Sequence, residues 1–269
     1  MGEEMTAQEF TIALPGAGGR MGQMIQTVLA EQNIALKVAT ESTSSDKIGT
    51  KMMGVTVTDD STMLGQGRGC VIVDFTRPDV TMAHLAIARK SGTPMVIGTT
   101  GLSAEDEQKI AEAARDIPLV YCANTSVGVT FLSRIVRDVA RALSDEWDIE
   151  IVETHHHHKI DAPSGTALAL GHAAAEGRGV ALEAVRDSGR DGETGARKTG
   201  DIGFAVLRGG DVAGEHTVSF FGQQERIELT HRATGRIIFA RGAVAAARFA
   251  ASAPAGLYDM TDVLGLSSD

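Results

Sequence analysis

A glycine-rich loop stands between the first apolar run of the chain and its first amphipathic stretch. Residues 10–15 (FTIALP) are apolar enough for a buried strand, and residues 21–31 have helical spacing. Between them lies Gly16-Ala17-Gly18-Gly19-Arg20-Met21-Gly22, one residue off the common G-x-G-x-x-G spacing. Glycines let the backbone turn tightly and approach a pyrophosphate, which then faces the amides that open the helix. The loop therefore predicts a dinucleotide site, with a simple strand-to-helix turn as the alternative.

An acidic residue, Glu41, follows the second expected strand at residues 34–40. A carboxylate about 20 residues beyond the loop can accept hydrogen bonds from the ribose hydroxyls of adenosine, although a solvated strand end would look the same. Such a carboxylate repels an added 2′-phosphate unless a cation lies beside it. Ser42 to Ser45 carry no charge, and Lys47 is the first cation. We therefore expect NADH to be used at least as well as NADPH.

The first half of the chain alternates apolar runs with amphipathic stretches. Further strands are expected at residues 70–75, 94–98 and 119–122, and helices at 79–91 and 104–116. Strands that are continuously apolar and alternate with helices indicate a parallel sheet covered on both faces. We expect a doubly wound, Rossmann-like α/β domain that binds the dinucleotide, formed by residues 1–128 and 240–269.

The pattern changes after a helix expected over residues 129–143. Residues 148–154 (DIEIVET) alternate polar and apolar, as in a strand with one covered face. Residues 177–200 are rich in Gly, Arg and Asp, which predicts a long loop. Successive antiparallel strands are expected at 202–207, 215–221 and 226–231, and a closing helix at 235–251. Residues 129–239 should thus form an α+β domain with a mixed or antiparallel sheet. A partner subunit could cover this sheet.

The composition argues against several classes of protein. The chain is 43% hydrophobic and 22% charged, so it can bury an ordinary core. Its net charge of −10 argues against binding to nucleic acid. The acidic start, MGEEMTAQEF, lacks the apolar centre of a secretion signal, and no apolar run reaches the ~20 residues that span a bilayer. With Cys70 and Cys122 interpreted as buried free thiols, we expect a cytoplasmic protein without membrane contact.

Four consecutive histidines, His155 to His158, are followed by Lys159. An affinity tag does not fit an internal run. A metal site is not expected, because consecutive residues of an extended segment point to opposite faces and no carboxylate or thiol stands nearby at ligand spacing. A histidine and a lysine after a strand end can instead pair with a carboxylate and transfer protons near neutral pH. We therefore expect an anion-binding catalytic loop here.

A second anion site is expected where Ser164-Gly165-Thr166 opens a helical run, TALALGHAAA. The Thr166 hydroxyl and the amides at a helix start attract negative charge. Two such clusters, about a dozen residues apart, suit a small dicarboxylate. The alternative is a polar loop capped by Ser164.

Several motifs, taken in chain order, resemble those of the dihydrodipicolinate reductase family. Residues 153–167, ETHHHHKIDAPSGTA, are similar to the family signature E-[AT]-H-H-x-x-K-x-D-A-P-S-G-T-A, and residues 16–22 are similar to its glycine loop. Other family segments are found as DFTRP (74–78), GTTG (98–101), ANTSVG (123–128) and GEHT (214–217). These matches cover nearly the whole chain.

The resemblance implies reduction of the dehydrated form of 4-hydroxy-tetrahydrodipicolinate to tetrahydrodipicolinate, by hydride transfer from NADH or NADPH, in diaminopimelate and lysine biosynthesis. The substrate would be a small dicarboxylate cyclic imine, and the protein a homotetramer. His155 matches the family's proton donor or acceptor and Lys159 its second proton donor. His156, Gly165 and Thr166 match substrate-binding residues.

The resemblance also implies where the cofactor binds. To the contacts already expected in the glycine loop (Gly16, Ala17, Gly18, Gly19, Arg20 and Met21) and at Glu41, it adds two strand-end turns along the nicotinamide half, formed by Gly98, Thr99, Thr100, Cys122, Ala123, Asn124 and Thr125. Relatives often have a basic residue where Ser42 stands, which argues against strong use of NADPH. His157 and His158 fall at variable positions and receive no role.

Three rival functions stay open at this point. An amino-acid dehydrogenase of the aspartate type would share the layout without needing the DAPSGT segment. A non-catalytic protein that senses NAD would keep the glycine loop and lose the His/Lys pair. A metal-dependent hydratase built on the histidine run is the third.

Overall fold

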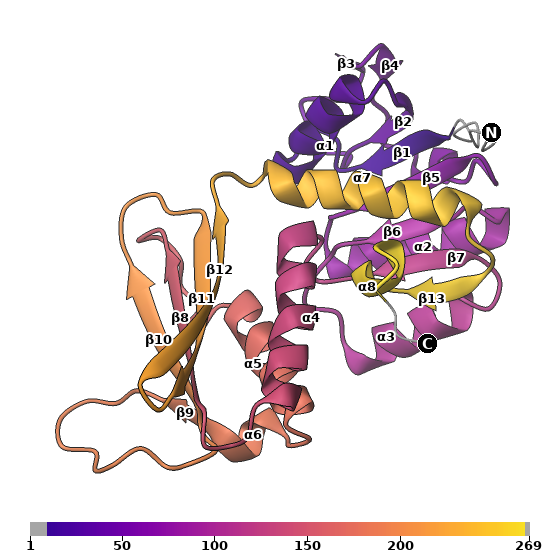
Figure 1. Ribbon diagram of the computed structural model, residues 1–269. Helices are drawn as coiled ribbons and strands as arrows, with labels where there is room; N and C mark the ends of the chain where they lie inside the picture. The colour runs from indigo at the N-terminus through magenta and orange to yellow at the C-terminus, as the bar shows by residue number, and fades with distance from the viewer. Residues whose placement is uncertain (1–9, 267–269) are drawn as a thin grey trace, which may run out of the picture. The chain divides into compact units, whose positions relative to one another are not determined.

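The chain folds into two compact units (Figure 1). This computed structural model describes residues 10–266, so the acidic segment discussed above lies outside the described residues except for Phe10. Unit 1 combines the described residues up to Ser126 with those from Ile237 onward, and unit 2 runs from Val127 to Arg236.

Unit 1 is built on a six-stranded sheet. Its strands, in spatial order, are β13 (Gly256–Tyr258), β7 (Pro118–Tyr121), β6 (Met95–Ile97), β5 (Cys70–Asp74), β1 (Thr11–Pro15) and β2 (Ala35–Thr40). Every neighbouring pair is parallel. Every residue of β5 and β6 is buried, as expected for strands covered on both faces. The doubly wound parallel sheet predicted from the apolar runs is therefore confirmed.

Helices complete unit 1. They are α1 (Arg20–Glu31), α2 (Pro78–Ser91), α3 (Ala104–Ala113), α7 (Ile237–Ser252), the short α8 (Met260–Val263) and the 3₁₀ turn η1 (Ser61–Leu64). Leu85 of α2 and Ile110 of α3 share a core cluster with Ile72 of β5. Helix α7 packs on α1 and on β5, β6 and β7, which it crosses in Figure 1.

The helix boundaries follow from local chemistry. Helix α2 has Pro78 in its first turn and ends at Gly92, whose φ of 71° gives a left-handed cap. Helix α3 begins with a capping box in which Ser103 and Asp106 bond each other's backbone. Both starts agree with those predicted from the sequence.

Unit 2 holds a mixed five-stranded sheet. Its order is β12 (Glu225–Ala233), β11 (Gly214–Gly222), β8 (Asp148–His155), β10 (Ile202–Arg208) and β9 (Arg186–Ser188). Strand β8 shows the predicted alternation, with every second residue buried. The expectation of three successive antiparallel strands is wrong for β10, which lies parallel to β8 and is separated from β11 by it. The order of the strands depends on which strand edge is available to pair with β10. Local residue patterns do not encode this choice.

Two helices cover one face of this sheet (Figure 1). They are α4 (Val127–Ala142) and α5 (Gly165–Gly177). Val136 and Leu170 from the two helices share a core with Ile151 of β8 and Phe220 of β11. A Cβ at Gly177 would collide with the carbonyl oxygen of Arg137, so the glycine allows the two helices to approach closely.

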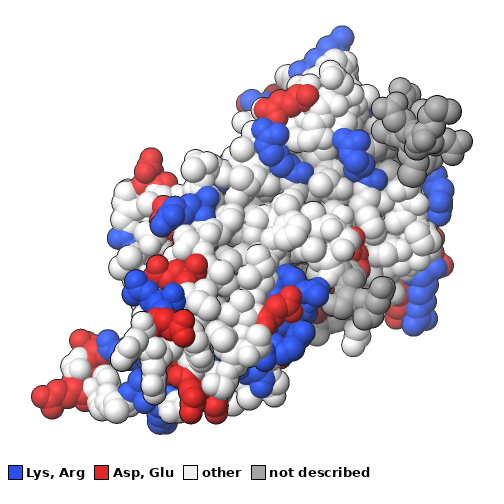
Figure 2. All heavy atoms as spheres, viewed as in Figure 1, with Lys and Arg blue, Asp and Glu red and all other residues white. Residues whose placement is uncertain are grey.

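The composition of residues 177–200 predicts a long loop, but the segment is not loop throughout. It contains α6 (Leu182–Val185) and β9 before the chain returns to the sheet. Arg190 and Arg197 tie the rest to the sheet, each donating to Glu150 at 2.8 and 2.9 Å. On the face shown in Figure 2, acidic and basic side chains accordingly lie side by side over this part of unit 2.

Several short elements escaped prediction. They are β13, α8, η1 and the hairpin of β3 (Lys51–Met52) and β4 (Val55–Thr56). Within residues 10–266, no helix is both long and apolar enough to cross a membrane.

Candidate active site

The glycine loop turns at the carboxyl end of β1. Gly16 has a φ of 65°, which glycine adopts without strain, and its N–H donates to the carbonyl of Thr40 at 2.9 Å. A Cβ at Gly22 would collide with the carbonyl oxygens of Gly16 and Ala17. Glycine is thus required where the loop and α1 pack together.

The start of α1 is suited to bind an anion. Its N-cap, Gly19, makes no side-chain hydrogen bond, and its first turn contains no acidic residue. The first amides of a helix have no partner within the helix, and the helix dipole is positive there. The loop lines a cavity of about 180 Å³, together with Phe75 beyond β5. These features fit the pyrophosphate of a dinucleotide at the point where the strand order reverses between β1 and β5.

Glu41 is in contact with the glycine loop. Its Oε1 accepts the N–H of Gly18 at 2.6 Å. A Cβ built at Gly18 would lie 3.1 Å from Glu41 Oε1 and 3.1 Å from Cγ of Lys47. A carboxylate has acceptor capacity beyond one hydrogen bond, so Glu41 can also receive ribose hydroxyls. Lys47, six residues after Glu41, thus also lies beside Gly18. Its Nζ pairs with Asp46 at 3.1 Å.

A buried polar network lies beneath the G-T-T-G turn. Asp74 Oδ1 accepts hydrogen bonds from the N–H and hydroxyl of Thr76 at 2.8 and 2.6 Å, and its Oδ2 lies 2.7 Å from His84 Nδ1. Thr81 bridges Asp74 to the Thr99 hydroxyl, which is 2.7 Å away. The Thr99 side chain is therefore engaged in the protein interior, whereas Thr100 is exposed. A cofactor would meet Thr99 through its backbone.

The fourth predicted cofactor segment, residues 122–125, is held by its own side chains. The Thr125 hydroxyl donates to the carbonyl of Phe239 at 2.7 Å, and Asn124 Oδ1 accepts the N–H of Ser126 at 2.9 Å. Burial, with a smaller contribution from Asp259, raises the pKa of Cys122 to about 12. This thiol is neutral near pH 7. Both cysteines are free, as expected, but only Cys70 is fully buried, whereas Cys122 is partly exposed.

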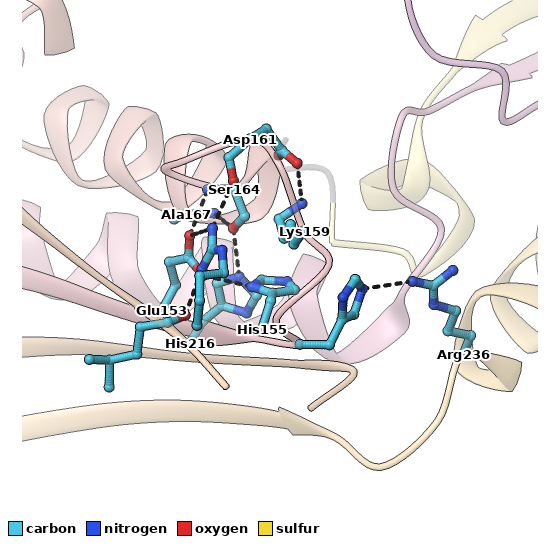
Figure 3. A network of polar contacts seen from close by, with 11 residues as sticks. Glu153, His155, Lys159, Asp161, Ser164, Ala167, His216 and Arg236 are labelled. Atoms are coloured by element: carbon cyan, nitrogen blue, oxygen red, sulfur yellow. Dashed lines mark hydrogen bonds and ion pairs between the residues drawn. The ribbon is translucent and has the colours of Figure 1, made fainter. Parts of the chain in front are cut away.

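In unit 2 the histidine run begins on the last residue of β8. His155 is buried, and its Nδ1 lies 2.6 Å from Oε2 of Glu153, which is 1% exposed (Figure 3). Arg208, the last residue of β10, donates to both oxygens of Glu153 at 2.8 Å each. Burial alone raises the pKa of Glu153, but the hydrogen bonds from Arg208, His155 and the Ser164 N–H outweigh it and leave the pKa below its usual range.

The remaining histidines leave the sheet. His156 lies near Arg236, with 3.2 Å between its Nε2 and the guanidinium, and desolvation followed by nearby positive charge lowers its pKa. His157 and His158 stack on each other with ring centroids 3.7 Å apart. Lys159 follows in the loop and pairs with Asp161 at 2.8 Å (Figure 3). The four rings therefore do not converge on one point.

Helix α5 starts immediately after this loop. Its N-cap is Ser164, whose Oγ accepts the N–H of Ala167 at 3.1 Å and lies 2.9 Å from Nε2 of His216. Gly165 and Thr166 form the first turn, at the positive end of the helix dipole. Nothing lies within 4 Å of where a Cβ of Gly165 would be, so this turn is open to an approaching ligand.

Three polar residues of this site had no assigned role in the sequence analysis. Glu153 and His216 belong to matched motifs. The sequence around Arg208 does not indicate which carboxylate it pairs with. His216 is 3% exposed, and burial lowers its pKa to about 4. Its ring meets that of His155 edge to face, with centroids 5.2 Å apart. Among the residues that the structure describes, no cluster of three or more His, Cys, Asp or Glu side chains could hold a metal ion.

Comparisons with known proteins agree along the whole chain. The family models "Dihydrodipicolinate reductase, N-terminus" and "Dihydrodipicolinate reductase, C-terminus" match residues 10–125 and 128–264. A 4-hydroxy-tetrahydrodipicolinate reductase from Ruegeria sp. (strain TM1040) is 51% identical over 95% of this chain and 98% of its own length. One from Nitrosomonas eutropha is 46% identical over 96% and 98%. A dipicolinate-bound dihydrodipicolinate reductase from Paenisporosarcina sp. TG-14 superposes with a TM-score of 0.73 at 23% identity, covering 94% of this chain and 98% of that one.

Proposed function

This chain belongs to the dihydrodipicolinate reductase family, and we propose that unit 1 binds its dinucleotide while unit 2 binds and protonates its substrate. The reaction is the reduction of the dehydrated form of 4-hydroxy-tetrahydrodipicolinate to tetrahydrodipicolinate with NAD(P)H, in diaminopimelate and lysine biosynthesis. The observation that carries this conclusion is the identity of about half of all residues to named reductases over 95% of the chain.

The proposed dinucleotide contacts are the predicted ones in unit 1. The loop from Gly16 to Met21 would hold the pyrophosphate at the start of α1, and Glu41 would receive the adenosine ribose. The turns at 98–100 and 122–125 follow β6 and β7 and would receive the nicotinamide half. When bound, the dinucleotide supplies the hydride. The Glu41 carboxylate, which would repel a 2′-phosphate, supports NADH as a substrate at least as good as NADPH, and Lys47 beside it is the cation through which NADPH would still be used.

The proposed substrate contacts lie in unit 2. Gly165 and Thr166, at the positive end of α5, would bind one carboxylate of the cyclic imine, and His156 would contact the substrate as well. Reduction of the ring leaves negative charge on it, so a nearby acid must supply a proton. His155 and Lys159 are proposed as these acids. His155 is the last residue of β8 and Lys159 lies in the loop that follows, and the pairing of His155 with Glu153 supports its assignment.

We also propose a homotetramer joined through the sheet of unit 2. The face of the sheet that α4 and α5 do not cover carries Leu207, which is 55% exposed, and Phe221, which is half-buried. These apolar side chains would be covered by a second subunit. A cytoplasmic location is proposed as well, in keeping with the biosynthetic role and with two free cysteines.

The test is whether the purified chain oxidises NADH or NADPH when freshly generated 4-hydroxy-tetrahydrodipicolinate is added. The rivals make other predictions. An aspartate-type dehydrogenase would reduce NAD⁺ in the presence of the amino acid, and a sensor would bind NADH without turnover. A metal-dependent hydratase would lose its activity in the presence of a chelator.

A further inference from the structure

Glu153 is the most heavily engaged carboxylate of unit 2. Its Oε1 accepts the N–H of Ser164 at 2.9 Å and one Arg208 nitrogen at 2.8 Å. Its Oε2 accepts the other Arg208 nitrogen at 2.8 Å and lies 2.6 Å from His155 Nδ1. An isolated charge at a site 1% exposed would be strongly disfavoured, and the forked guanidinium offsets that cost. The carboxylate is therefore held ionised in the interior.

We propose that Glu153, kept ionised by Arg208, is a positioning residue that holds the proton of His155 on Nδ1 and leaves Nε2 to exchange protons with the substrate. An ionised carboxylate can only accept hydrogen bonds, so the His155 nitrogen 2.6 Å away must be the donor. The imidazole is then either the neutral Nδ1–H tautomer or the doubly protonated cation. The two states differ only in whether Nε2 carries a proton.

The space around His155 Nε2 is cleared by a glycine. A Cβ at Gly214, the first residue of β11, would lie 3.0 Å from that nitrogen. This is closer than a carbon atom can comfortably approach. The backbone of β11 therefore lies beside Nε2 without a side chain that would cover it, whereas Nδ1 is turned to Glu153 (Figure 3).

His216 does not disturb the hydrogen bond between Glu153 and His155. It lies two residues along β11 from Gly214 and contacts the His155 ring edge to face. Because its low pKa leaves it neutral near pH 7, it adds no positive charge that would oppose protonation of His155. Ser164 holds its Nε2, so His216 does not compete for the carboxylate.

This inference rests on the proposed function, in which His155 supplies a proton. In that step the Nε2–H bond breaks, its electron pair stays on the nitrogen, and the proton forms a new bond to the reduced ring. His155 returns to the neutral Nδ1–H form, still bonded to Glu153. The carboxylate thus favours the cation before the step and fixes the tautomer after it.

The tautomer can be observed in the unaltered protein. The measurement is the ¹⁵N shift of both ring nitrogens in protein with labelled histidines, with the His155 signals assigned by their loss in His155→Gln. At a pH where His155 is neutral, we expect a protonated Nδ1 and an unprotonated Nε2. A proton on Nε2 with Nδ1 bare would overturn the proposal, and the tautomer is read in the unaltered protein, with the variant used only to assign the signals.

The kinetic test compares two glutamates of β8. In Glu153→Gln, an acceptor for Nδ1–H remains but the charge is lost. We expect kcat to fall at least ~10-fold and KM to change less than about threefold, because the proton of His155 is no longer held on Nδ1 by an ionised carboxylate while the proposed substrate contacts stay in place. Glu150→Gln is the matched control, because Glu150 also pairs with two arginines but belongs to the other face of the strand. It should leave kcat and KM unchanged.

A purely structural role of Glu153 would give a different result. The Glu153→Gln variant would be less stable, but its folded fraction would keep the kcat and KM of wild type.

The outcomes separate the two proposals. A wild-type protein that oxidises neither coenzyme contradicts the proposed function, and a fully active His155→Gln contradicts the role of His155. If wild type is active and His155→Gln is not, then a Glu153→Gln variant with kcat and KM within twofold of wild type overturns the positioning role alone.

Discussion

Asp74 Oδ2 lies 2.7 Å from His84 Nδ1 inside unit 1, and the two side chains are 0% and 6% exposed. Thr81, from the first turn of α2, bonds the other carboxylate oxygen and reaches Thr99. The network joins the ends of β5 and β6 to α2, where the cofactor turn begins. Its removal should therefore affect both stability and NADH binding.

We expect Asp74→Ala to lower the free energy of unfolding by about 3–5 kcal/mol, because it leaves buried partners unpaired. Thr81→Val, which removes only a hydroxyl, should cost about 1–2 kcal/mol and weaken NADH binding. Denaturant midpoints and NADH titrations measure both effects. Asp79→Asn is the control, since its pair with Arg77 is 75% exposed and should contribute under about 1 kcal/mol. Equal effects of Asp74→Ala and the control would contradict this account.

The choice of coenzyme depends on the surroundings of Glu41. Wild type should use NADH at least as well as NADPH, because this carboxylate repels a 2′-phosphate. Ser42→Arg should raise the NADPH to NADH ratio of kcat/KM about tenfold by adding a phosphate-binding guanidinium. Lys47→Ala should lower whatever NADPH use remains, because Lys47 lies beside Gly18 and Glu41. A wild-type preference of tenfold or more for NADPH would refute this interpretation.

The buried His216 predicts how stability depends on pH. Its pKa is lowered to about 4 in the folded protein, so the unfolded chain binds more protons between about pH 4 and 6.5. The free energy of unfolding should therefore be full above pH 6.5 and decline as the pH falls through this window. The contribution of His216 is at most about 3 kcal/mol. Denaturant unfolding at several pH values should show a shallower decline for His216→Gln than for wild type, and parallel curves would contradict the assignment.

The two proposed acids should matter for turnover more than for affinity. We expect His155→Gln and Lys159→Ala each to lose at least ~10²-fold in kcat, with smaller changes in KM. Steady-state kinetics with saturating NADH measures both. His172→Gln is a control, because this histidine lies on α5 and is 59% exposed. A near-wild-type kcat in both variants would remove His155 and Lys159 from the chemistry.

Much of the fold could be predicted because its signals are local. Continuous apolar strands such as β5, the glycine loop, the N-cap Ser103 and the first-turn Pro78 each depend on a few adjacent residues. Strand β13 could not be predicted in this way, since it has three residues and exists only because β7 offers an edge. The position of β10 beside β8 is likewise a long-range choice.

The site shows the same division. His155 and Lys159 could be identified from a motif. The pairing of Arg208 with Glu153 could not, because the two residues are 55 positions apart and meet only once β10 pairs with β8. Thr99 shows what a motif leaves out. The motif predicts a cofactor contact, and the structure adds that the hydroxyl is engaged with Thr81 in the interior, so that the contact would use the backbone.

The most direct test follows the absorbance of NADH, and then of NADPH, as purified protein is mixed with freshly generated 4-hydroxy-tetrahydrodipicolinate. We predict rapid oxidation of NADH, at least as fast as that of NADPH, and its loss in His155→Gln. Tight binding of NADH without oxidation of either coenzyme would contradict the reductase assignment and favour an amino-acid dehydrogenase or a sensor of NAD.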